Sequence, residues 1–215
     1  MHESSGARLP RSFFSRPTRL VARELLGCQL IRVLEGTRLA GIIVETEAYI
    51  GERDLACHAK AGKTTRTAVM YGPAGFSYVY FTYGMHWMLN IVTEREGVPA
   101  AVLIRALQPT MGMERMKTNR GTTEHQMLCR GPARLTQAME ITKKENGLDL
   151  CHESSSIWIQ ASGGLNKRRI AVSSRIGLGN TPEPWLSKRW RYFIEGNPFV
   201  SGSSTRSSSS LAIAP

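Results

Sequence analysis

The sequence predicts an α+β fold: one domain with a curved, largely antiparallel β-sheet, flanking helices and a protruding aromatic β-hairpin. The chain has 215 residues, of which 41% are hydrophobic, and this is enough to bury one sizeable core. Segments rich in β-branched and aromatic residues, separated by turn residues, dominate the middle of the chain, as expected for strands. Helical patterns precede and follow them, which favours an α+β domain.

The first expected element is a helix from about Thr18 to Gly27. Thr18 is a suitable N-cap, and Gly27 is a suitable C-terminal stop. The apolar stripe of this helix consists of Val21, Ala22, Leu25 and Leu26. Five strands are then expected, over residues 29–33, 40–49, 75–83, 88–93 and 100–106.

A second helix is expected to start near Pro132, because proline fits the first turn of a helix, and to continue to Met139. Its N-terminal amides would lie beside Arg130 and Arg134, so this end could bind a phosphate. Further strands are expected at 157–161 and 191–195, with 170–178 as a third candidate.

The two ends of the chain are expected to lie outside the folded domain. Residues 1–12 are predicted to form a flexible N-terminal segment. Residues 201–215 contain seven serines and almost no apolar side chains before Leu211, which is typical of a disordered tail. The folded domain is therefore expected over residues 13–200.

The charge of the chain indicates a polyanionic partner. It carries 28 Lys and Arg against 17 Asp and Glu, a formal net charge of +11, so nucleic acid is the leading candidate. Residues 163–191 contain seven basic side chains and one acid, whereas residues 35–54 contain five acids and two bases. Composition by itself leaves DNA and RNA equally open.

The cysteines and the hydropathy pattern narrow the class of protein. Cys28, Cys57, Cys129 and Cys151 form no C-x-x-C pair, so we expect reduced thiols and neither a zinc site nor a disulfide framework. A thiol nucleophile at Cys57 beside His58 is disfavoured, because sequence neighbours on an extended segment point to opposite faces. No apolar run is long enough to cross a membrane. We expect a cytoplasmic protein, or a nuclear one in a eukaryote.

The segment from Val44 to Tyr49 places two acids in a covered strand. Alternate residues of a strand share a face, so Glu45, Glu47 and Tyr49 should point the same way, with the carboxylates about 7 Å apart. Burial would raise the proton affinity of one acid into the range useful for a general base acting on water. The alternative is a sheet edge decorated with solvated acids.

Aromatic side chains follow in the next strand. Tyr78, Tyr80 and Thr82 should share one face, with Phe81 and Tyr83 on the other. Most of these rings are expected to fill core positions. Tyr83 is expected at a hairpin tip, where an exposed ring on a basic protein can wedge into a DNA stack.

Together these residues resemble the alkyladenine DNA glycosylase family, the mammalian type of 3-methyladenine DNA glycosylase. The resemblance covers about residues 13–200. It is carried by seven motifs in the same order: I-V-E-T-E-A-Y at 43–49, His58, Y-V-Y-x-x-Y-G-M at 78–85, Asn90, V-L-x-R-A-L at 102–107, Gly131-Pro132, and R-x-G-x-G at 175–179.

The resemblance implies a role for individual residues. Glu47 corresponds to the general base that deprotonates the water attacking the sugar C1′, and Arg105 corresponds to the arginine beside that water. The residues implied to contact the flipped base are Tyr49, His58, Tyr80, Asn90 and Leu178. Tyr83 and Met85 correspond to the intercalating pair, and Arg66 and Arg134 to phosphate-contacting positions.

The resemblance also implies the reaction. A monofunctional glycosylase in base excision repair would flip alkylated or deaminated purines (3-methyladenine, 7-methylguanine, hypoxanthine and ethenoadenine) out of double-stranded DNA, act as a monomer and leave an abasic site. No metal or organic cofactor is implied. Two alternatives are a non-catalytic module that binds RNA or damaged DNA and a zinc-dependent nucleobase deaminase, whose H-x-E and P-C-x-x-C signatures are missing.

Overall fold

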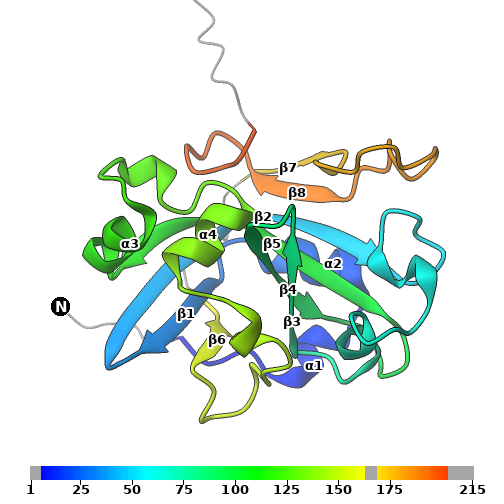
Figure 1. Ribbon diagram of the computed structural model, residues 1–215, viewed down its shortest axis with the longest axis horizontal. Helices are drawn as coiled ribbons and strands as arrows, with labels where there is room; N and C mark the ends of the chain where they lie inside the picture. Colours follow the sequence, from blue (N-terminus) through cyan, green and yellow to red (C-terminus); the bar gives the residue numbers. More distant parts are fainter. Residues whose placement is uncertain (1–5, 163–168, 203–215) are drawn as a thin grey trace, which may run out of the picture.

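An antiparallel sheet forms the centre of the computed structural model, which describes residues 6–162 and 169–202. The main path of the sheet has the order β3-β4-β5-β2-β1-β6, and β8 pairs with both β2 and β7. Its strands are β1 (Gln29–Leu34), β2 (Thr37–Ile50), β3 (Ser77–Thr82), β4 (His86–Val92), β5 (Ala100–Met111), β6 (Ile157–Gln160), β7 (Ile170–Ser173) and β8 (Arg191–Ile194). Figure 1 shows the long strands β2 and β5 crossing the middle of the molecule.

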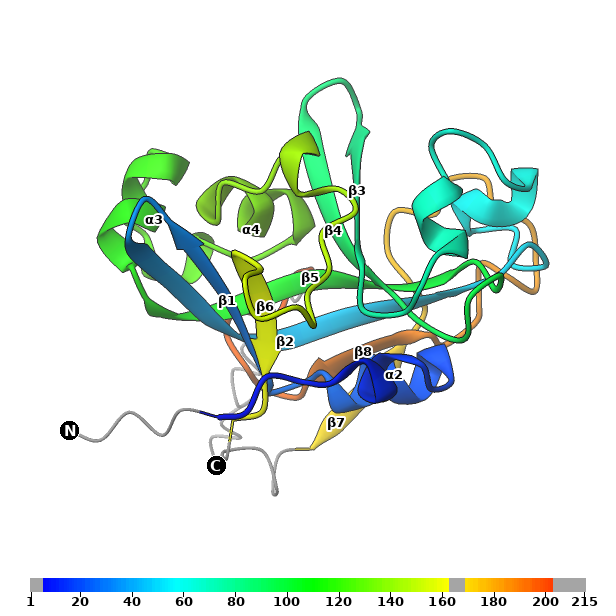
Figure 2. The same cartoon turned by 90° about the horizontal axis from the view of Figure 1, so that it is seen from below.

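Short helices cover the two faces of the sheet. The helices are α1 (Arg11–Phe14), α2 (Thr18–Glu24), α3 (Met113–Arg120) and α4 (Pro132–Ala138), with 3₁₀ turns η1 (His58–Ala61), η2 (Ala68–Tyr71), η3 (His125–Met127) and η4 (Lys143–Glu145). Helix α2 packs on β2 and β5, while α4 packs on β4 and β5 and contacts α3. Figure 2 shows α2 on one side of the sheet and α3 and α4 on the other.

Strand β2 has partners on both sides where it carries the two predicted acids. Glu45 to Glu47 lie between β5 and β8, so this segment is central and the alternative of a solvated sheet edge is wrong. The pairing of β2 with β5 shifts register on both sides of Glu45. Glu45 faces Ala106 and Thr46 faces Ile104, which leaves Arg105 without an opposite residue. Such a bulge redirects a side chain relative to the regular alternation.

The predicted α+β class is confirmed, and the elements differ from the expected ones mainly at their ends. Thr18 is the first residue of α2 and not its N-cap, because Pro17 takes the N-cap position. Strands β2 and β5 extend beyond the predicted bounds, whereas β7 stops at Ser173 instead of continuing to 178. Helix α3 was not predicted, since Met116 is its single buried residue and its sequence carries no apolar stripe.

Several sequence predictions fall at the limits of the described chain. Residues 1–5, 163–168 and 203–215 lie outside it, including Lys167, Arg168 and most of the predicted tail. Within the predicted N-terminal segment, Arg8 forms an isolated bridge with Gln160, and α1 begins at Arg11. Among the described residues, no helix has the length and apolar character needed to cross a membrane.

A buried hydrogen bond between α2 and β2 gives a direct test of this architecture. Thr46 Oγ1 donates to the carbonyl oxygen of Ala22 at 2.7 Å, and both residues are fully buried. We expect Thr46→Val to lower the free energy of unfolding by about 1–2 kcal/mol, because the buried carbonyl loses its hydrogen-bond donor. Urea denaturation followed by circular dichroism measures the change.

The matched control is Thr37→Val at the exposed start of the same strand. It should change the free energy of unfolding by less than about 0.5 kcal/mol. Equal effects of the two substitutions would contradict the contribution assigned to the buried hydrogen bond.

Candidate active site

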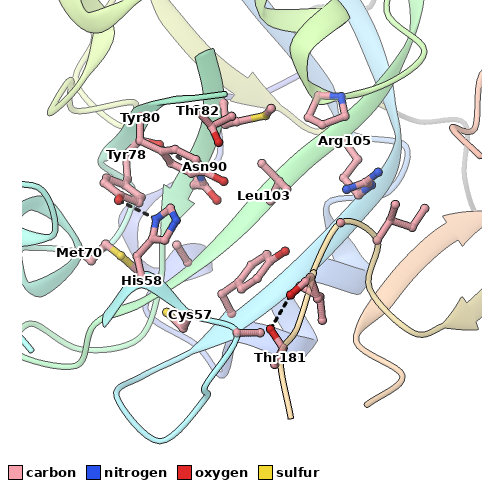
Figure 3. Close-up of a pocket in the computed structure, with 18 of the residues that line it drawn as sticks. Cys57, His58, Met70, Tyr78, Tyr80, Thr82, Asn90, Leu103, Arg105 and Thr181 are labelled. Carbon is pink, nitrogen blue, oxygen red and sulfur yellow. Dashed lines mark hydrogen bonds between the residues drawn. The ribbon is translucent and has the colours of Figure 1, made fainter. Parts of the chain in front are cut away.

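A cavity of about 360 Å³ opens where β2, β3, β4 and β5 meet the segments that contain His58 and Leu178. Its wall includes all five residues implied to contact a base: Tyr49, His58, Tyr80, Asn90 and Leu178. Arg105, Tyr78, Tyr83 and Pro132 also line it. Figure 3 shows His58, Tyr78 and Tyr80 gathered on one side of the cavity, with Arg105 on another. The structure therefore assembles residues that lie more than a hundred positions apart in the sequence.

The aromatic wall is fixed by contacts around His58. Its imidazole packs edge to face against Tyr80, with ring centroids 4.4 Å apart, and its Nδ1 lies 3.0 Å from the Tyr78 hydroxyl. Burial, reinforced by the positive charges of Arg66 and Lys60, lowers the pKa of His58 to about 4. The imidazole is therefore neutral at physiological pH and brings no positive charge to the cavity.

Glu47 lies directly behind the cavity wall. Its side chain is fully buried and is held by two hydrogen bonds and one ion pair. Its Oε1 accepts from the amide of Ile176 at 2.7 Å and lies 3.2 Å from Arg105 Nη1. Its Oε2 accepts from the Tyr49 hydroxyl at 2.8 Å. Tyr49, Arg105 and Ile176 all line the cavity, whereas Glu47 itself does not.

The environment of Glu47 raises its pKa above the ordinary value. Burial is the largest cause, and it outweighs the lowering by Arg105 and by the hydrogen bonds from Ile176 and Tyr49. Burial also raises the pKa of Tyr49 well above its ordinary value, and the Glu47 charge adds to this rise. Tyr49 therefore stays protonated and donates its hydroxyl hydrogen to the carboxylate.

Glu45 shares a face with Glu47 but has a different set of contacts. Its Oε1 accepts from Arg105 Nε and Arg191 Nε, each at 2.7 Å. The Ser201 amide donates to Glu45 Oε2 at 2.6 Å, and the Ser201 hydroxyl donates to Glu45 Oε1 at 2.9 Å. Glu45 is saturated by these donors and serves to hold Arg105 beside Glu47. Burial lowers the pKa of Arg105, but the two carboxylates outweigh it and leave the pKa raised.

Sequence reasoning identified neither Arg191 nor Ser201 as part of this cluster. Ser201 is the first residue of the predicted tail, yet its side chain is buried. The serine-rich composition of this stretch did not indicate that one serine would donate hydrogen bonds to a buried carboxylate. Arg191 belongs to a basic stretch that pointed to DNA binding, whereas its guanidinium pairs inside the protein.

Two further base-contacting candidates, Asn90 and Leu178, also line the cavity. Asn90 is buried on β4, and its Nδ2 donates to the carbonyl oxygen of Tyr78 at 3.1 Å. Leu178 lies in the segment after β7 that also supplies Ile176 and Gly177 to the cavity. Thr181 Oγ1 donates to the Leu178 carbonyl at 2.7 Å, which braces this segment.

Tyr83 and Met85 lie in the turn between the paired strands β3 and β4. They are 76% and 68% exposed. Tyr83 has a positive φ of 53° and Gly84 one of 67°, which reverses the chain. Phe81 instead packs against Trp87, with centroids 4.7 Å apart. The exposed ring of Tyr83 therefore borders the cavity mouth without a core role.

The two arginines implied to contact phosphates differ in their surroundings. Arg66 is exposed beside the aromatic wall, with its guanidinium 5.2 Å from the centre of the Tyr80 ring. Arg134 is half-buried in α4 and donates to the carbonyl oxygen of Arg130 at 3.3 Å. Neither arginine lines the cavity, but Arg66 packs against Tyr80, which does.

The cysteines offer no alternative nucleophile. All four are free, and burial raises the pKa of Cys57 to about 12. A thiol with that pKa stays protonated at physiological pH. In the part of the chain that the structure describes, no group of histidine, cysteine and carboxylate side chains could hold a metal ion.

An ion pair between Arg175 and Asp54 was also missed. Both side chains are fully buried, and their atoms form two hydrogen bonds, of 2.6 and 2.9 Å. The R-x-G-x-G motif marked the position of Arg175, but no sequence signal connected it with an acid 121 residues earlier.

Comparisons with known proteins show which family this chain resembles. The family model described as methylpurine-DNA glycosylase (MPG) matches residues 12–198. A relative from Methanocella arvoryzae is 46% identical over 194 residues, covering 90% of this chain and 95% of the relative. Relatives from Alkaliphilus oremlandii and Carboxydothermus hydrogenoformans are each 44% identical and cover 90% of this chain and 98% of the relative.

All three relatives carry the printed name "Putative 3-methyladenine DNA glycosylase". The match of the family model extends over most of the described chain and includes every residue of the cavity wall. The resemblance inferred from seven sequence motifs is thereby confirmed, and this chain belongs to the methylpurine-DNA glycosylase family.

Proposed function

We propose that this protein is a monofunctional DNA glycosylase that flips an alkylated or deaminated purine into the cavity and hydrolyses its N-glycosidic bond with water activated by Glu47. The observation that carries the proposal is the buried carboxylate of Glu47, held by Arg105, Ile176 and Tyr49 behind an aromatic cavity. The family membership supplies DNA as the substrate.

The hydrogen bonds of Glu47 are compatible with binding one further donor. An ionised carboxylate offers about four acceptor positions. The hydrogen bonds from Tyr49 and Ile176 use two of them, and the Arg105 guanidinium lies against a third. A water molecule at the fourth position could donate one proton to Glu47 and direct its oxygen toward the sugar C1′. Glu45 holds Arg105 in place, so the Arg105 guanidinium can stabilise the ionised carboxylate of Glu47 without moving away.

The cavity suits a flat base with little or no negative charge. Tyr49, His58 and Tyr80 supply aromatic surface, and His58, being neutral, adds no positive charge that would repel a cationic purine. A cation over an aromatic ring is stabilised by about 0.5–2 kcal/mol. The cavity should therefore favour cationic purines such as 3-methyladenine and 7-methylguanine, and it should also bind the neutral bases hypoxanthine and ethenoadenine.

Asn90 offers a means of rejecting normal guanine. Its amide nitrogen is tied to the Tyr78 carbonyl, so the side chain cannot swing away from an incoming base without losing that bond. We propose that the exocyclic 2-amino group of guanine meets this fixed side chain. Leu178, with its neighbours in the segment after β7, closes another part of the wall.

The remaining expected contacts concern the DNA duplex. Tyr83, with Met85 beside it, fills the gap left by the extruded nucleotide, because its exposed ring stands at the cavity mouth. Arg66 contacts a phosphate next to the lesion, and Arg134 contacts one farther along the backbone. Such contacts carry no sequence information and weaken as salt concentration rises.

The role of Glu47 as the general base predicts a large kinetic effect of Glu47→Gln. Single-turnover release of hypoxanthine from a duplex should fall about 10²- to 10⁴-fold, because the amide cannot accept the proton from water. Lesion binding should be retained, and strand breaks should appear only after alkali treatment of the wild-type product.

The matched control for this substitution is Glu114→Gln, which changes an exposed acid in α3 and should leave the rate unchanged. Tight lesion binding by the wild-type protein without any base release would reject the enzymatic proposal and favour a damage-binding module.

The raised pKa of Glu47 predicts that the rate of base release falls at acidic pH. The base must be ionised to accept a proton, so hydrolysis should decline as the pH falls through this pKa, with a midpoint above the ordinary glutamate value of 4.5. Saturating single-turnover rates with a hypoxanthine duplex, corrected for release without enzyme, give the midpoint. A midpoint at or below 4.5 would contradict the effect of burial on this carboxyl group.

An intercalating role for Tyr83 predicts a loss in lesion processing without a loss in stability. Tyr83→Ala should weaken specific binding about tenfold to a hundredfold, as expected for the loss of one ring that stacks on a base. Tyr83→Phe keeps the ring and should behave like the wild type. Because the side chain is largely exposed, the thermal midpoint should stay the same in both variants, and equal binding by Tyr83→Ala and Tyr83→Phe would exclude stacking by this residue.

A further inference from the structure

The buried ion pair between Arg175 and Asp54 has no role in the hydrolysis proposed above. Asp54 belongs to the segment between β2 and η1, and it accepts hydrogen bonds from the amides of Ile50 and Ala56. Arg175 follows β7 and donates to the Ala48 and Trp185 carbonyls as well as to Asp54. The pair therefore joins two segments that each line the cavity, one containing His58 and the other Leu178.

Arg175 also lies against the ring that is expected to stack on the base. Its guanidinium carbon is 4.7 Å from the centre of the Tyr49 ring. Since Arg175 covers one face of that ring, a base can stack only on the other face. The Tyr49 ring then lies between a permanent cation of the protein and the substrate.

The charge of Asp54 decides how this arrangement treats a cationic base. A cation is attracted to the electron-rich face of an aromatic ring, but a second cation on the opposite face repels it at short range, and burial strengthens that repulsion. Asp54 lies 2.6 Å from Arg175 Nη1 and cancels its charge. Tyr49 is thereby backed by a neutral pair, and its free face keeps its attraction for a positively charged base.

We infer that Asp54 and Arg175 are specificity-determining residues, which act through Tyr49 to set the preference for cationic over neutral lesions. The inference rests on the proposed function, because it concerns the base that stacks on Tyr49. Neither residue touches that base, so both are positioning residues. Asp54 preserves selectivity for purines such as 7-methylguanine, while hypoxanthine, which is neutral, is insensitive to the balance of charge behind the ring.

The test compares two duplexes that differ only in the lesion, 7-methylguanine or hypoxanthine, with the same enzyme preparation. The measured quantity is the ratio of the second-order rate constants for base release, so the fraction of folded enzyme cancels. Asp54→Asn leaves the Arg175 charge uncompensated and should lower the ratio of 7-methylguanine to hypoxanthine about tenfold.

Two further variants separate the charge effect from structural damage. Arg175→Gln removes the cation behind Tyr49 and should keep the ratio at or above its wild-type value. The double variant Asp54→Asn with Arg175→Gln has no charge at either position and should restore the ratio to within about twofold of the wild type, whatever its absolute rate. A structural defect alone would lower both rates together in all three variants.

An unchanged ratio in Asp54→Asn, or a ratio that stays low in the double variant, would overturn the inference while leaving the proposed function intact. The proposed function fails separately, if the wild-type protein releases neither base.

Discussion

The cluster of two acids and two arginines at the centre of the sheet constrains the rest of the structure. Glu45 and Glu47 lie between β5 and β8 with no exposed side-chain surface. Buried charges are costly unless they are paired and hydrogen-bonded. Arg105 and Arg191 supply the positive charges, and Ser201 supplies two more donors to Glu45. The bulge beside Glu45 leaves Arg105 free to contact both acids, and the segment that ends at Ser201 brings two more donors to Glu45.

The two carboxylates differ in their contacts, and the reaction we propose uses only Glu47 as a base. Glu45 is saturated by donors and fixes Arg105, whereas Glu47 accepts fewer hydrogen bonds and has a raised pKa. A general base needs a raised proton affinity but must still ionise near neutral pH. Burial provides the first property, and Arg105 with the Ile176 amide and the Tyr49 hydroxyl provides the second. The Arg105 guanidinium contacts both acids, with Nε 2.7 Å from Glu45 and Nη1 3.2 Å from Glu47.

Local sequence signals predicted the elements and the residues that lie on them. The strands around 40–49 and 100–106 were visible from β-branched and aromatic composition, and alternation along the first of them placed Glu45, Glu47 and Tyr49 on one face. Pro132 marked the start of α4, as observed. His58 could be brought to the cavity only through the resemblance to a family, because a lone histidine carries no information about its partners.

Contacts that depend on register and tertiary packing were not predictable. The shift that leaves Arg105 unpaired in the strand ladder belongs to the pairing of β2 with β5, and the alternation of residues within one strand does not show it. The Arg175 and Asp54 pair joins segments that are far apart in sequence, and Ser201 lies in a stretch whose composition is typical of disorder. Helix α3 buries little besides Met116, so its sequence lacks the apolar periodicity on which helix prediction depends.

The most direct test of the account is a crystal structure of the Glu47→Gln protein bound to a duplex containing ethenoadenine. The account predicts that the lesion lies in the cavity against Tyr49, that Tyr83 occupies the gap in the duplex, and that a water molecule contacts both residue 47 and Arg105 on the side of the sugar C1′. A lesion that remains stacked in the duplex, or a flipped base with no water between residue 47 and C1′, would contradict the central claim that Glu47 activates the attacking water.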